Sequence, residues 1–194
     1  MTDPIVIKGI TQDDLLELDE QDDNQHIEVD NGEIIFVEHD IGFLNTKIIQ
    51  ILFLHLHAYL QQNPIGDVFI DGARYILFST QQGIQRAYKP DFSFIRKGRI
   101  APDFNWSGDF IGAPDLAVEI LSPGQTIKQM ISKLDHYFEA GTSEAWLIYP
   151  DKQTVYQYQV DGDMPLVYGT NDALESALFP NLKIILREIF TPAP

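Results

Sequence analysis

A strand–helix–strand unit in the second half of the chain sets the strongest limit on the fold. Residues 115–121 and 145–149 form apolar runs that are typical of buried strands. Between them, residues 126–140 place apolar side chains at helical spacing, and Gly141 stands where a helix would end. A strand, a helix and a second strand in this order favour a sheet covered by helices. The sequence therefore predicts the α/β class, or α+β with a mixed sheet flanked by helices.

The other predicted elements fit around this unit in one domain. Thr11 is expected to cap a short helix that ends near residue 20, and Asn31-Gly32 predicts a hairpin turn. Residues 44–62 are apolar on nearly every face, which predicts a helix packed on two sides. The remaining predicted strands are 67–70, 75–78, 91–95, 154–160 and 166–168. Because no repeat or linker divides the chain, we expect a single domain over residues 1–194, with an acidic N-terminal segment at about residues 1–40.

Charge is distributed unevenly along the chain. The net charge is −16, and the first 40 residues hold thirteen acids and one base, a net charge of −12. The other 154 residues therefore carry only −4, and five bases lie between residues 86 and 99. A strongly negative surface disfavours nucleic acid because it repels phosphate. Since the excess charge lies in one segment, it does not exclude a nucleic-acid partner.

Composition excludes several classes of site, and the apolar pattern of the chain bears on its compartment. The chain has no cysteine, which excludes thiolate nucleophiles and metal sites built on thiolates. Its longest apolar stretch, residues 48–60, is shorter than the roughly 20 residues that a membrane-spanning helix needs. The first residues lack the pattern of a secretory signal. We therefore expect a cytoplasmic protein that is not embedded in a membrane.

Two acids within apolar strands, Asp91 and Glu119, are the strongest candidates for chemistry, because a buried acid is costly unless a partner compensates it. Asp115 shares a strand face with Glu119 but lies about 13 Å away at roughly 3.3 Å per residue, so these two cannot hold one metal ion. Asp91 and Glu119 can do so if their strands are neighbours. The structural alternatives are a turn aspartate for Asp91 and, for Glu119, an ion pair with an arginine such as Arg86 or Arg96.

Motifs around these acids resemble a known family. Pro90-Asp91 on one strand and Glu119-x-Leu121 on the next resemble the PD-(D/E)XK nuclease pattern, with its lysine missing. The chain resembles more specifically the Uma-type family of restriction-endonuclease-like proteins. The residues that carry this resemblance are the stretch 113–123, Lys133, Tyr137, Gly141, Glu144-Ala-Trp146 and Pro150, with the hairpin 27–33 and the tail 177–182. The resemblance covers nearly the whole chain and implies a restriction-endonuclease-like fold.

The resemblance also implies a metal site and a displaced lysine. Asp91, Glu119 and the backbone carbonyl of Ile120 would bind Mg²⁺ or Mn²⁺, for which oxygen ligands are suited. Leu121 stands where the family pattern has its lysine, and the resemblance implies that this role has moved to Lys133 on the following helix. Lys133 would hold the attacking water or neutralise the scissile phosphate. Its alternative is an ordinary solvated lysine.

Other residues are candidates for supporting roles. The candidates for contacts around the site are Asp115, Gln129 and Tyr137. The candidates for phosphate contacts are Arg86, Lys89, Arg96, Lys97 and Arg99, whose alternative is ordinary surface charge. A histidine that the family often has near the start of its first long helix is replaced here by Asn45.

Three functional hypotheses follow. The first is a Mg²⁺-dependent endonuclease that acts on DNA, with Asp91, Glu119 and Lys133 as its catalytic residues. The second is a binding or scaffold protein that retains the nuclease fold without turnover. The third, glycoside hydrolysis by paired carboxylates, fits poorly because Trp106 is the one candidate platform for a sugar. The apolar helix at residues 44–60 is compatible with a homodimer.

Overall fold

The computed structural model describes residues 9–21, 25–38 and 42–190. Parts of the acidic N-terminal segment, at 1–8, 22–24 and 39–40, lie outside the described residues. The helices found in the described ranges are α1 (Gln12–Gln21), α2 (Phe43–Gln62), α3 (Ile127–Glu139) and α4 (Leu186–Phe190), with a 3₁₀ turn at Pro150–Lys152. None of these helices is both long and apolar enough to span a membrane.

A six-stranded mixed sheet forms the centre of the molecule, in the order β11-β10-β9-β8-β6-β3. Its strands are β3 (Gly66–Ile70), β6 (Phe92–Arg96), β8 (Leu116–Ile120), β9 (Glu144–Tyr149), β10 (Thr154–Gln159) and β11 (Leu166–Tyr168). Strands β8 and β9 are parallel, and α3 connects them, whereas β6 runs antiparallel to β8. This arrangement confirms the predicted strand–helix–strand unit.

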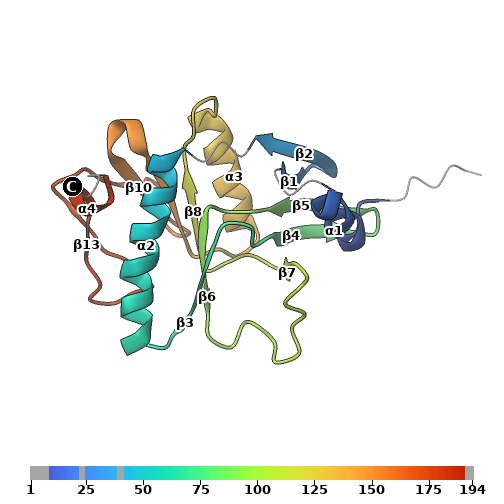
Figure 1. Cartoon of the computed structure of the whole chain (residues 1–194), viewed down its shortest axis with the longest axis horizontal. Coiled ribbons are helices and arrows are strands. Elements are labelled where there is room, and N and C mark those ends of the chain that lie inside the picture. The colour runs from blue at the N-terminus through green and yellow to red at the C-terminus, as the bar shows by residue number, and fades with distance from the viewer. Residues whose placement is uncertain (1–8, 22–24, 39–41, 191–194) are drawn as a thin grey trace, which may run out of the picture.

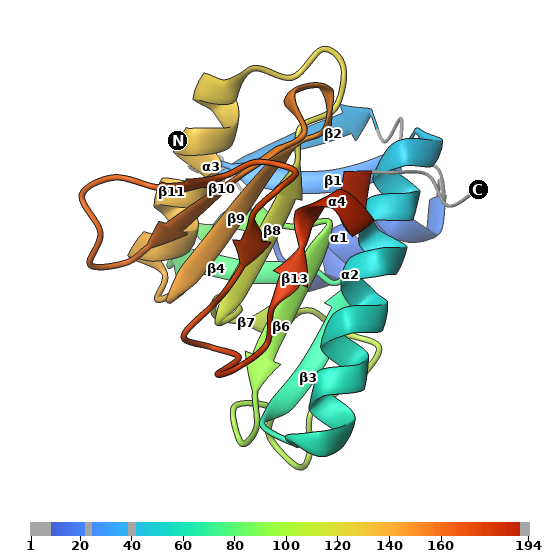
Figure 2. The same cartoon turned by 90° about the vertical axis from the view of Figure 1, so that its left-hand side faces the viewer.

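Helices cover both faces of this sheet (Figures 1 and 2). Side chains of β8 point alternately to the two faces of the sheet, so each face has its own apolar layer. Leu116, Val118 and Ile120 join one apolar cluster with buried residues of α2 and α4. Ala117 on the opposite face joins a second cluster with Leu134 and other residues of α3. The face that also carries Glu119 is therefore the face beneath α3.

A second, five-stranded sheet lies beside the first, in the order β2-β1-β5-β4-β7. Its strands are β1 (Gln25–Asp30), β2 (Glu33–Glu38), β4 (Tyr75–Thr80), β5 (Gly83–Tyr88) and β7 (Phe110–Ile111). Leu15 of α1 packs against this sheet with Val29 and Ile76. The two sheets are joined by a hydrogen bond of 2.7 Å between the hydroxyls of Tyr75 in β4 and Ser93 in β6. A small third sheet pairs β12 (Ala173–Leu174) with β13 (Ile184–Ile185).

Local signals predicted several of these features correctly. Asn31 and Gly32 have φ angles of 50° and 75°, as a tight hairpin turn requires, and they join β1 to β2. Thr11 accepts a hydrogen bond from the N–H of Asp14 at the start of α1, which confirms its role as a cap. Gly141 has a φ of 106° just after α3.

One prediction about the elements was wrong, and strand β5 was missed. Helix α2 packs on one side only: Ile48 and Leu52 are fully buried, whereas Leu54 is 57% exposed. The reason is that α2 covers one outer face of the central sheet, so its far side meets solvent. Strand β5 was not predicted, because Gly83–Tyr88 includes Gln85 and Arg86 and lacks a long apolar run.

Candidate active site

Glu119 lies near the end of β8 on the face beneath α3, and it is 4% exposed. Two side chains from α3 meet its carboxylate. The Nζ atom of Lys133 lies 3.0 Å from Oε1 and 3.1 Å from Oε2, and the hydroxyl of Tyr137 donates a hydrogen bond of 2.9 Å to Oε1. Lys133 and Tyr137 can both reach Glu119 because they lie one helical turn apart. The basic partner of Glu119 is thus Lys133, whereas the arginines considered as alternative partners, Arg86 and Arg96, contact Glu139 and Asp115.

Asp91 lies directly before β6, and its side chain is hydrogen-bonded to the backbone of the neighbouring strand β8. Its Oδ2 atom accepts a hydrogen bond of 2.6 Å from the backbone N–H of Ile120, the residue that follows Glu119. The antiparallel pairing of β6 with β8 explains this proximity, since Phe92 lies opposite Val118. The first strand residue is Phe92, one position later than predicted.

Lys133 lies between two carboxylates. Besides its contact with Glu119, its Nζ atom lies 2.7 Å from Oε1 of Glu28 in β1. The lysine side chain is 13% exposed, and its ammonium lies over the ring of Tyr88, 5.5 Å from the centroid. The alternative of a solvated lysine is therefore wrong. Burial alone lowers the pKa of Lys133, but the charges of Glu119 and Glu28 outweigh it, so the pKa lies above its ordinary value.

Sequence reasoning missed Glu28, although the residue belongs to the hairpin that carries the family resemblance. Its Oε1 atom also accepts a hydrogen bond of 3.0 Å from the backbone N–H of Lys89. Glu28 stands between Ile27 and Val29, two apolar strand residues, in the same pattern as Glu119 between Val118 and Ile120. This pattern of an acid inside an apolar strand is the signal that could have identified it.

The surroundings of Glu119 raise the pKa of its carboxyl group. Burial raises the pKa of Glu119 to about 8, and Lys133 acts in the opposite direction. The negative charges of Asp91 and Glu28 add to the rise. A carboxylate in this position is therefore costly to ionise unless further positive charge is supplied.

A cavity of about 390 Å³ opens beside these residues, between the β1–β2 hairpin and α3. Glu28, Lys133 and His136 are among the side chains that line it. His136 was not predicted as a site residue; its Nδ1 atom shares a hydrogen bond of 2.7 Å with the hydroxyl of Tyr88, which also donates to Asp30. The ammonium of Lys133 thus lies at the boundary between the buried carboxylates and an open cavity.

Several predicted residues lie away from this cluster. Asp115, before the first residue of β8, accepts hydrogen bonds from the backbone N–H of Arg96 and from Nη1 of Arg99, both at 2.8 Å. Gln129 forms a capping box with Thr126 at the start of α3, although it also lines the cavity. The structure thus brings Asp91, Glu119, Lys133 and Tyr137 together and uses Asp115 at the opposite end of β8.

Four of the five predicted phosphate contacts take part in ion pairs within the protein. Arg86 contacts Glu139 at 2.5 Å, and Arg96 and Arg99 contact Asp115. Lys89 contacts Asp19 of α1 at 3.0 Å, and its side chain is 9% exposed. Lys97 lies elsewhere, beside a cavity next to the end of α2. Asp19, one of the acids of the N-terminal segment, therefore compensates a base inside the molecule.

The cluster offers few ligands for a divalent cation. Among the described residues, no group of three or more histidine, aspartate and glutamate side chains could hold a metal ion. Asp91 and Glu119 offer two carboxylates, and the negative charge of Asp91 raises the pKa of Glu119. Carboxylate oxygens are the ligand type that Mg²⁺ and Mn²⁺ prefer, and a cation beside these two acids would remove their repulsion.

Comparison with known proteins agrees with the fold. The model of the Uma2 family, described as "Putative restriction endonuclease", matches residues 12–187. The chain is also similar to a crystal structure from Anabaena variabilis, described as "a putative nuclease belonging to DUF820", with a TM-score of 0.74 and 26% identity over 93% of this chain and 97% of that chain. No curated protein matches the chain. Since the family match spans most of the sequence and the structural match spans nearly all of both chains, this protein belongs to the Uma2 family of restriction-endonuclease-like proteins.

Proposed function

We propose that this protein is a metal-dependent nuclease that hydrolyses phosphodiester bonds in DNA. The observation that carries the proposal is the contact of Lys133 with Glu119 beside the peptide group that binds Asp91. Two acids and a lysine are the residue types that the PD-(D/E)XK pattern requires. Here the lysine comes from α3, and Leu121 occupies the position after β8 at which the pattern has it.

The backbone supports a third ligand. The N–H of Leu121 donates to Ile148 of β9, whereas the N–H of Ile120 donates to Asp91 on the other side of β8. In a strand, the N–H and C=O of one residue point to the same side. The carbonyl of Ile120 is therefore directed to the side of Asp91, where it can join the two carboxylates as a ligand.

Each residue has a distinct role in the proposed reaction. Asp91, Glu119 and the carbonyl of Ile120 would hold the cation, which when bound polarises the phosphodiester and lowers the pKa of the attacking water. Tyr137 fixes the carboxylate of Glu119 through its hydrogen bond. Lys133 remains charged between Glu119 and Glu28 and donates a hydrogen bond to the attacking water or to the phosphate.

Binding of DNA requires positive charge at the surface, and part of it is available. The side chains of Arg96 and Arg99 are 53% and 36% exposed while they contact Asp115. Such partly exposed arginines retain N–H donors for phosphate. Arg86, Lys97 and Lys89 complete the proposed set, although Lys89 is largely buried.

The direct test is cleavage of single- and double-stranded DNA by the purified protein with Mg²⁺ or Mn²⁺. Asp91→Asn, Glu119→Gln and Lys133→Met are each expected to lower the cleavage rate at least a hundredfold. Lys128→Met is the matched control, because Lys128 is an exposed lysine of the same helix. Cleavage that persists in Glu119→Gln at the wild-type rate contradicts the assignment.

The second candidate function is a binding or scaffold protein without turnover. The observation in its favour is that Lys133 and Tyr137 already bind both oxygens of Glu119. Calorimetric titration with Mg²⁺ and Mn²⁺ separates the two functions. A nuclease binds metal and loses binding in Asp91→Asn, whereas absence of binding at millimolar metal supports the non-catalytic function.

A further inference from the structure

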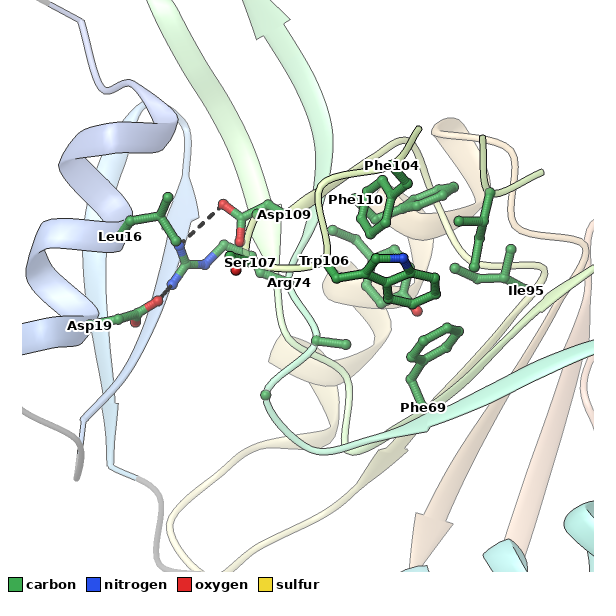
Figure 3. A pocket seen from close by; sticks show the side chains of 15 residues that line it. Leu16, Asp19, Phe69, Arg74, Ile95, Phe104, Trp106, Ser107, Asp109 and Phe110 are labelled. Atoms are coloured by element: carbon green, nitrogen blue, oxygen red, sulfur yellow. Dashed lines mark hydrogen bonds and ion pairs between the residues drawn. The ribbon is translucent and has the colours of Figure 1, made fainter. Parts of the chain in front are cut away.

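A second cavity, of about 300 Å³, lies on another part of the molecule and is not used by the proposed reaction. Figure 3 shows the side chains of Phe69, Phe104, Trp106 and Phe110 directed toward one another around it, with Ile95 of β6 beside them. Its walls come from α1, β3, β6 and the long loop between β6 and β8. A cavity of this size with aromatic walls is typical of a site for a small planar group.

The aromatic walls are supported by contacts within the loop. The rings of Phe104 and Trp106 meet edge to face at 5.3 Å, and Phe110 makes a similar contact with Tyr75 at 5.7 Å. Trp106 remains 70% exposed in spite of these contacts. Large aromatic side chains usually bury most of their surface. An exposed tryptophan on a supported loop therefore offers a ring face to a ligand.

The polar end of the cavity is formed by Arg74, whose side chain is 1% exposed. Its guanidinium lies between Asp19 and Asp109, as Figure 3 shows. Within the described part of the chain, the Nε atom of Arg74 has no hydrogen-bond partner. A buried N–H without an acceptor is costly, so a ligand that supplies an acceptor gains from entering.

This cavity and the candidate active site share one strand. Asp91 directly precedes β6, Ser93 and Ile95 lie on one face of that strand, and Ser93 is bonded to Tyr75, which lines the cavity. Ile95 follows Asp91 by four residues, about 13 Å along the strand. A few nucleotides of one nucleic-acid strand span this distance.

We propose that the cavity of Trp106 and Arg74 accepts an unstacked nucleobase of the strand bound at the candidate active site. The aromatic rings would stack on the base, and Arg74 would donate to an acceptor on its edge. This inference rests on the proposed function and narrows it: the preferred substrate carries unpaired bases, as single strands and loops do.

The test measures binding separately from cleavage, in EDTA. The chain has two tryptophans, and Trp146 is buried, so quenching of the exposed tryptophan reports on Trp106. A short oligothymidylate is compared with an abasic strand of the same length and backbone. We expect the oligothymidylate to quench the fluorescence and to bind about tenfold more tightly than the abasic strand.

Variants test whether the preference for strands that carry bases depends on this cavity. Anisotropy of the labelled strands should show that Trp106→Ala removes the preference for bases, whereas Trp106→Phe retains most of it. Phe78→Ala is the control, because Phe78 is an exposed aromatic residue of β4 that does not line the cavity. Circular dichroism confirms that each variant is folded.

The outcomes separate this inference from the proposed function. Equal binding of the two strands, or an unchanged preference in Trp106→Ala, overturns the inference and assigns the cavity to another occupant, even if the protein cleaves DNA. A preference that depends on Trp106 in a protein that does not cleave with Mg²⁺ supports the base site and contradicts the nuclease. Absence of binding to either strand also overturns the inference.

Discussion

The ammonium of Lys133 lies 2.7 Å from the carboxylate of Glu28, so a residue of the β1–β2 hairpin holds the lysine of α3. The same ammonium lies 3.0 Å from Glu119. The two acids and the lysine form a buried group of titratable side chains whose protonation states depend on one another.

Replacing Glu28 should destabilise the protein even though the residue is far from Lys133 in sequence. Glu28→Gln retains an acceptor but removes one of the charges that compensate Lys133, so we expect a loss of about 2 kcal/mol in the free energy of unfolding. Urea denaturation measures this loss. The control is Glu175→Gln, which breaks the exposed pair with Lys183 and should cost less than about 1 kcal/mol. Equal losses in both variants would contradict the role of Glu28.

The stability of the metal-free protein should depend on the protonation of Glu119. The pKa of Glu119 is raised from 4.5 to about 8 in the folded protein, chiefly by burial. Its protonated form therefore favours folding; this contribution is complete below pH 4.5 and is lost as the pH rises through 8. Glu119→Gln cannot lose a proton. As the pH rises from 4.5 to 8, the free energy of unfolding of the wild type should therefore fall by at least about 1.4 kcal/mol more than that of Glu119→Gln. This is the amount that a shift of one pKa unit implies.

Urea denaturation in EDTA at several pH values measures the difference between the wild type and Glu119→Gln. A difference that stays constant over this range shows that Glu119 ionises in the folded protein as readily as in the unfolded chain.

Divalent metal should stabilise the folded protein. At a hundredfold excess over Kd, a ligand that binds only the folded state adds about 2.7 kcal/mol, which raises Tm. Mg²⁺ or Mn²⁺ should therefore raise the Tm of the wild type, and EDTA should reverse the change. Asp91→Asn should abolish the shift, whereas Asp135→Asn, which changes an exposed acid of α3, should retain it. A shift of full size in Asp91→Asn excludes Asp91 as a ligand.

The cap of α3 should contribute to stability. Thr126 accepts a hydrogen bond from the N–H of Gln129, and the side chain of Gln129 accepts one from the N–H of Thr126. Thr126→Ala breaks this reciprocal pair and should cost about 1 kcal/mol in thermal or urea unfolding. Ser132→Ala, at an exposed position of the same helix, should leave the stability within about 0.5 kcal/mol. A Thr126→Ala variant as stable as Ser132→Ala would show that the cap contributes nothing.

Sequence patterns predicted those parts of the fold and cluster that depend on local periodicity. The period of two in β8 indicates the face of Glu119, and the period of 3.6 in α3 indicates that Lys133 and Tyr137 share a side. Both periods follow from backbone geometry, so they hold in the structure. The roles of these residues in a reaction remain predictions.

The contacts of the charged residues could not be predicted, because they depend on how distant segments pack. Arg86 meets Glu139 across 53 residues, and Lys89 meets Asp19 across 70. Nothing in the local pattern distinguishes such bases from bases that face solvent. The local pattern marks Glu28 as a buried acid, but its partner Lys133 could not be predicted, because it lies 105 residues away.

Lys89 makes contacts near both the candidate active site and the aromatic cavity. Its backbone N–H is bonded to Glu28 at the candidate active site, and its ammonium is bonded to Asp19, which also contacts Arg74 in the aromatic cavity. Lys89 is thus bonded to an acid beside each of the two cavities. Substitutions at Glu28 and Asp19 should therefore be non-additive in their free energies, since both act on the same lysine.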